Sequence, residues 1–71
     1  MKARELRRIL ERPPLAYSRV RQEGSHTRLR SAHYPELLFA FHDNQTLPPH
    51  LVKKILTKDV GLSVDDALAL L

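Results

Sequence analysis

The spacing of the apolar residues changes twice along the chain, and this change limits the possible fold classes. Near the start, Leu6, Ile9 and Leu10 recur at the interval of an amphipathic helix. In the middle, residues 16–21 and 26–30 alternate between polar and apolar side chains, as half-buried strands do. After Pro48 the helical interval returns. This order predicts an α+β fold rather than a domain of one element type.

Proline and glycine residues set the limits of the strands. A first helix over residues 2–12 must end at Arg12-Pro13-Pro14, because a residue that precedes proline is pushed out of the helical region. The turn at residues 22–25 contains Gly24, the natural site for a positive φ. A third strand, Leu37–Phe41, is apolar on both faces, so we expect it to be the most buried of the three.

Two helices are predicted after the strands. Proline suits the first turn of the helix that follows Pro48, and Gly61 is placed to end it. Ser63 has the character of an N-cap for a short last helix. In that helix we expect one apolar side, formed by Val64, Leu68 and Leu71.

The predicted architecture is one domain over residues 1–71, with a core over 2–62 and a helical extension over 63–71. We expect a three-stranded antiparallel sheet with two helices on one face and the short helix added at the end. The chain has 71 residues and no cysteine, so neither disulfides nor thiolate zinc sites reinforce it. It shows no signal-peptide core and no membrane-spanning run, which favours the cytoplasm.

Positive charge is concentrated in the first 30 residues. This part has nine basic and three acidic residues, whereas the remainder has three basic and five acidic ones. Eight of those nine basic residues are arginine, whose planar fork suits bidentate contact with phosphate. The asymmetry predicts a nucleic-acid partner, although a basic surface without a partner is the simpler alternative.

His26 is the best candidate for chemistry. If the first two strands form a hairpin, their alternation places it on one polar face with four arginines: Arg19, Arg21, Arg28 and Arg30. The opposite face, with Val20 and Leu29, would lie under the helices. Imidazole exchanges protons near neutral pH, and the 2′-hydroxyl of RNA supplies its own nucleophile, so no metal is required. Taken alone, however, a histidine in this position is more often an ordinary exposed strand residue.

The other candidates are weaker. None of the four histidines has the i, i+4 spacing of a metal pair on a helix, so no metal site is predicted, and His33 and His50 are expected to be solvated. His42 is either a second catalytic contact or a polar residue at a strand end. Tyr17 either stacks on a base or is a half-buried strand aromatic.

Two segments resemble the HicA-type toxins, the small ribonucleases of bacterial toxin–antitoxin pairs. Arg21-Gln22-Glu23-Gly24-Ser25-His26 is similar to the R-Q-x-G-S-H segment of that family, and the run from Leu47-Pro48-Pro49 to Leu56 is similar to its helix after the third strand. The chain departs from the family where Thr27-Arg28-Leu29 replaces a second histidine and an aromatic residue.

The resemblance implies a fold like that of double-stranded-RNA-binding domains and a toxin that arrests growth by cutting mRNA. It implies that His26 is the catalytic residue, that Gly24 and Ser25 shape the turn before it, and that no metal or other cofactor takes part. A HicB-type antitoxin would be the neutralising partner. We expect RNA contacts from Arg19, Arg21, Ser25, Arg28 and Arg30. The alternatives are a non-catalytic RNA-binding module of the same fold and, with less support, a small DNA-binding protein, for which no basic recognition helix is found.

Overall fold

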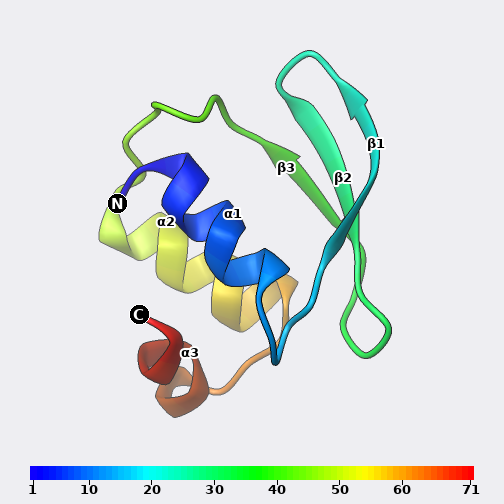
Figure 1. The fold of residues 1–71 in the computed structure, drawn as a ribbon. Coiled ribbons are helices and arrows are strands. Elements are labelled where there is room, and N and C mark those ends of the chain that lie inside the picture. The colour runs from blue at the N-terminus through cyan, green and yellow to red at the C-terminus, as the bar shows by residue number, and fades with distance from the viewer.

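The computed structural model describes all 71 residues and has the element order α-β-β-β-α-α (Figure 1). The elements are α1 (Ala3–Glu11), β1 (Ser18–Glu23), β2 (His26–Arg30), β3 (Leu37–Ala40), α2 (Pro49–Lys54), a π-helical segment that continues α2 (Ile55–Asp59), and α3 (Val64–Leu70). None of these helices could span a lipid bilayer.

The three strands form one antiparallel sheet in the order β1-β2-β3. Figure 1 shows α1 and α2 together on one side of this sheet, whereas α3 lies beyond them, away from the strands. The predicted α+β fold, with its resemblance to double-stranded-RNA-binding domains, is therefore confirmed. The opposite face of the sheet, which we call the outer face, is covered by no helix.

The core fills the space between the sheet and the helices. Leu29 of β2 and Phe39 of β3 point into it from the sheet, while Leu6 and Leu10 reach it from α1 and Leu56 from the π-helical segment. Leu6, Leu10, Leu29 and Leu56 are each 0% exposed. This packing explains the helical and alternating apolar patterns, because each pattern presents one side of its element to the same interior.

Strand β3 matches its prediction only in part. It lies at the edge of the sheet, and its burial alternates, with Leu37 and Phe39 inside and Leu38 58% exposed. This strand is the most buried of the three, as expected, but only by a small margin: two of its four residues are buried, against two of five in β2. The margin is small because helices cover only one face of the sheet. The apolar side chain of Leu38 therefore lies on the outer face.

A β-bulge at Val20 overturns part of the predicted hairpin. Arg19 pairs with Leu29 and Arg21 pairs with Arg28, so one extra residue is inserted in β1. An inserted residue reverses the side on which the flanking side chains lie. Arg19 therefore shares the helix-facing side with Leu29 rather than the polar face, and Val20, predicted to be covered, is 47% exposed.

The end of the preceding helix and the start of α3 follow the sequence, but the buried side of α3 does not. Gly61 has φ of +92°, and the hydroxyl of Ser63 accepts a hydrogen bond of 3.1 Å from the backbone N–H of Asp66, as an N-cap does. The predicted apolar side is exposed, at 47% for Val64, 62% for Leu68 and 55% for Leu71. Ala67, 2% exposed, packs against the core instead, because a small side chain allows the helix to approach closely.

Tyr17 is buried, which decides between the two roles predicted for it. It is 2% exposed, and its hydroxyl donates a hydrogen bond of 2.7 Å to the carbonyl oxygen of Pro35. Burial, with a smaller effect from the neighbouring Tyr34, raises the pKa of Tyr17 from 10.0 to about 12. Its ring is part of the core and offers no face for stacking on a base.

The raised pKa of Tyr17 predicts a loss of stability in alkali. Since the folded chain holds the phenol proton more tightly than the unfolded chain, this contribution is fully present below pH 10 and is lost as the pH rises toward about 12. Tyr17→Phe removes the hydrogen bond to Pro35 and should cost about 1 kcal/mol at neutral pH. Denaturant unfolding of both proteins should show this difference shrinking between pH 10 and 12, and a constant difference would contradict it.

Candidate functional site

A tight turn connects β1 to β2 and carries the candidate site. Glu23 pairs with His26, so Gly24 and Ser25 alone form the loop. Gly24 has φ of +59°, as predicted, whereas Ser25 does not adopt a positive φ. A two-residue hairpin with glycine first suits the twist of the paired strands. The turn therefore fixes where Ser25 and His26 stand relative to the sheet.

His26 lies on the outer face, in a shallow depression of about 160 Å³. We call this depression the outer hollow; its lining residues are Arg21, Glu23, His26, Arg28 and Leu38. The register of the hairpin between its turn and the bulge creates it, because Arg21 stands opposite Arg28 and Glu23 opposite His26. Of the four arginines predicted to surround His26, the structure brings two, Arg21 and Arg28, into the same hollow.

The arginines of the outer face already have carboxylate partners. Arg21 pairs with Glu23, and the guanidinium of Arg28 lies 3.4 Å from the carboxylate of Glu36. Arg30 lies further along the same strand, 3.9 Å from Glu36 and outside the hollow. Exposed ion pairs of this kind contribute about 0–1 kcal/mol, so a phosphate can replace these carboxylates at little cost. Glu36 was not among the predicted site residues, since only the β2–β3 pairing brings it beside these arginines.

The imidazole of His26 is accessible from solvent and takes part in no hydrogen bond with the protein. Both ring nitrogens are therefore free to contact a ligand. Beside two guanidinium groups, this arrangement can hold a phosphodiester and exchange a proton with one of its oxygens.

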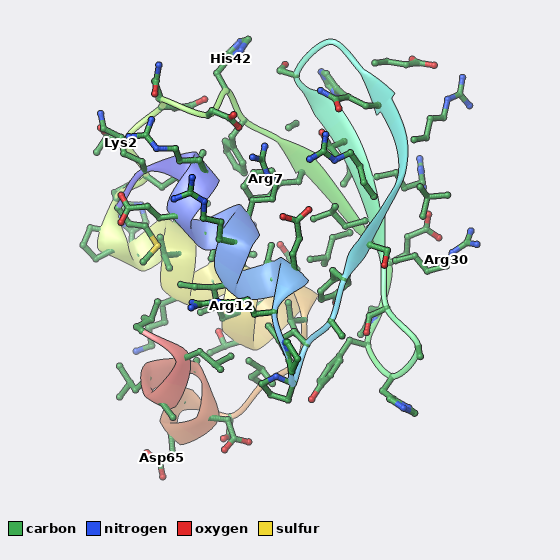
Figure 2. The ribbon with its side chains drawn as sticks, in the orientation of Figure 1. Lys2, Arg7, Arg12, Arg30, His42 and Asp65 are labelled. Atoms are coloured by element: carbon green, nitrogen blue, oxygen red, sulfur yellow. The ribbon has the colours of Figure 1, made fainter.

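A second depression, of about 330 Å³, lies on the helix-facing side of the hairpin. We call it the inner hollow; its lining residues are Arg7, Arg19, Gln22, Gly24, Ser25, Thr27, Phe41, His42 and Asp43. His42 thus belongs to a different depression from His26. Figure 2 shows His42 at the hairpin end of the molecule and Arg7 reaching from α1 toward the sheet.

The structure contains no group of three His, Cys, Asp or Glu side chains placed to hold a metal ion. His33 and His50 are exposed and line neither hollow. The two hollows bring together imidazole, guanidinium and carboxylate groups, with Glu23 in the outer hollow and Asp43 in the inner one.

Comparison with known proteins adds one finding. The family model described as the HicA toxin of bacterial toxin–antitoxin systems matches residues 3–62 of the chain. The match includes all three strands and both hollows and ends before α3. No curated protein and no solved structure matches the chain.

Proposed function

Because the chain belongs to the HicA family of toxins from bacterial toxin–antitoxin pairs, we propose that it is an endoribonuclease that cuts mRNA at the outer hollow. The observation that carries this proposal is the position of His26. It directly follows the Gly24-Ser25 turn, stands free on the outer face, and shares a hollow with Arg21 and Arg28. A proton-transfer group beside two fixed cations matches what cleavage of an RNA phosphodiester requires.

The reaction uses the nucleophile of the substrate. His26 removes the proton of a 2′-hydroxyl, the 2′-oxygen forms a bond to the adjacent phosphorus, and the bond from phosphorus to the 5′-oxygen breaks. The imidazolium returns the proton to the departing oxygen. Arg21 and Arg28 stabilise the additional negative charge on the phosphoryl oxygens while both bonds are partly formed. Arg30 extends the positive strip along β2 and holds the RNA beyond the cut.

The antitoxin that the family implies would be of the HicB type and would prevent RNA from reaching the site. The outer face is the surface it must block, since no element of the toxin itself covers it. We place the activity in the cytoplasm, where mRNA is available. The proposal involves no metal or organic cofactor.

One observation favours the alternative, a non-catalytic RNA-binding module. No protein group makes a hydrogen bond to the His26 ring, whereas a catalytic imidazole is often oriented by such a partner. In the proposed reaction, the RNA phosphate and the neighbouring arginines orient the ring on binding. Catalytic hydrogen bonds are commonly incomplete before substrate arrives.

Incubation of the purified chain with mRNA in excess chelator separates these functions. We expect cleavage, because the histidine mechanism needs no metal. Cleavage that chelator abolishes and a divalent ion restores would contradict the mechanism. Salt-sensitive binding without cleavage would identify the non-catalytic module instead.

A further inference from the structure

The inner hollow contains more hydrogen-bond donors than the protein uses. The Nε of Arg7 is buried and has no hydrogen-bond partner, which is costly for a charged side chain. Its nearest carboxylate oxygen, on Glu11, is 3.8 Å away. The Nη1 of Arg7 does pair with Asp43, at 2.5 Å. Arg7 therefore enters the hollow with part of its guanidinium unsatisfied.

Arg19 reaches the same hollow because of the bulge at Val20. Its Nη1 donates a hydrogen bond of 3.0 Å to the side chain of Gln22, and its Nη2 lies 4.0 Å from Glu11. The second distance is at the limit of an ion pair, so most of this guanidinium remains available. Without the bulge, Arg19 would lie on the outer face beside Arg21. If the side chains of β1 alternated without interruption, the inner hollow would thus contain only one arginine.

The remaining groups of the hollow also suit an anion. The hydroxyl of Ser25 makes no hydrogen bond within the protein, and His42 lies at the rim. Two carboxylates face Arg7 and Arg19: Asp43 in the lining and Glu11 just outside it, at 3.8 Å and 4.0 Å from the two guanidinium groups. The donors of Arg19 and Ser25 that these contacts leave unused suit a ligand rich in acceptor oxygens, such as a phosphate group.

We propose that the inner hollow is a second phosphate subsite, which binds a phosphodiester of the same RNA strand that is cut at the outer hollow. Arg7, Arg19 and Ser25 are its donors. The proposal rests on the ribonuclease function proposed above and adds the path of the substrate. The RNA crosses the end of the hairpin, so that neighbouring linkages contact the two hollows on either side of the Gly24-Ser25 turn.

The hairpin itself relates the two subsites. Ser25 and His26 are consecutive residues, yet Ser25 lines the inner hollow and His26 the outer one. The paired strands separate the hollows, and the two-residue turn is the edge over which a ligand can pass from one hollow to the other. An RNA strand held on both sides of this turn has its scissile linkage fixed beside His26, whereas a strand held by the outer face alone can slide.

The test uses wild-type protein and a 2′-O-methyl oligonucleotide, which binds but lacks the nucleophile for cleavage. Single linkages are replaced in turn by uncharged methylphosphonates, and the dissociation constant is measured for each. Arg28→Gln should abolish the sensitivity to one linkage and Arg19→Gln the sensitivity to a different, nearby one. Each variant should weaken binding about tenfold, the effect of one charge-assisted contact. Ser25→Ala should affect the same linkage as Arg19→Gln.

Arg12→Gln is the matched control, because Arg12 is exposed at the end of α1 and lines neither hollow (Figure 2). It should leave every linkage as sensitive as in the wild type. Suppose that Arg19→Gln behaves like Arg12→Gln, while Arg28→Gln abolishes the sensitivity of binding to one linkage. The inner subsite is then refuted and the proposed function stands. If the oligonucleotide and unmodified RNA both fail to bind, the subsite and the proposed function fail together.

Discussion

Replacement of His26 by alanine is expected to abolish growth arrest when the chain is expressed without its antitoxin. Alanine cannot take the 2′-hydroxyl proton or return it to the leaving oxygen, and loss of this catalysis slows cleavage about 10²- to 10⁴-fold. The arginines remain, so RNA binding should persist. Growth curves after induction, together with the fraction of intact mRNA, measure the effect.

This variant should fold normally, because the His26 side chain is exposed and makes no hydrogen bond that the fold needs. Surface changes of this kind alter stability by less than about 0.5 kcal/mol. His33→Ala is the matched control, since His33 is also exposed but lies in the loop between β2 and β3. It should remain toxic. A folded His26→Ala protein that arrests growth as fully as the wild type would remove His26 from the mechanism.

Leu29→Ala is expected to produce the largest loss of stability among the changes considered. Leu29 of the middle strand is 0% exposed, and truncation of a buried leucine costs about 2–5 kcal/mol through lost burial and the cavity that remains. The whole free energy of unfolding of a small domain without disulfides is only a few kcal/mol larger than this loss. Denaturant titration should show a large fall in the unfolding midpoint, with partial unfolding at 37 °C.

Leu38→Ala is the corresponding control for stability. It makes the same chemical change in the neighbouring strand, but Leu38 is 58% exposed on the outer face. We expect a cost of about 0.5 kcal/mol or less. Equal losses from the two variants would mean that the two faces of the sheet are assigned incorrectly, and with them the accessibility of His26.

Much of the fold was predictable because local chemistry determines it. The spacing of Leu6, Ile9 and Leu10 gave the first helix, and the structure has it at Ala3–Glu11. Gly24 occupies the left-handed region that its turn requires, and Ser63 caps α3. These features depend on a residue and its near neighbours, which is the information that a sequence contains directly.

The errors arose where pairing between distant segments decides the outcome. The bulge at Val20 depends on the register of β1 against β2, and no residue type in β1 announces it. Leu38 is apolar but lies on the face of the sheet that no helix covers (Figure 1), so its exposure could not be read from its residue type. For the site, alternation correctly placed Arg21 and Arg28 with His26 but put Arg19 on the wrong side. The inner hollow is assembled from α1, the hairpin and the loop after β3, and no single segment indicates it.

The most direct test of the proposed mechanism is the single-turnover rate of RNA cleavage by wild-type and His26→Ala proteins, both in excess chelator. We expect cleavage by the wild type, a rate at least about 10²-fold lower for the variant, and similar RNA affinity for both. Equal rates in the two proteins, with folding and RNA binding intact, would show that a group other than His26 performs the proton transfer.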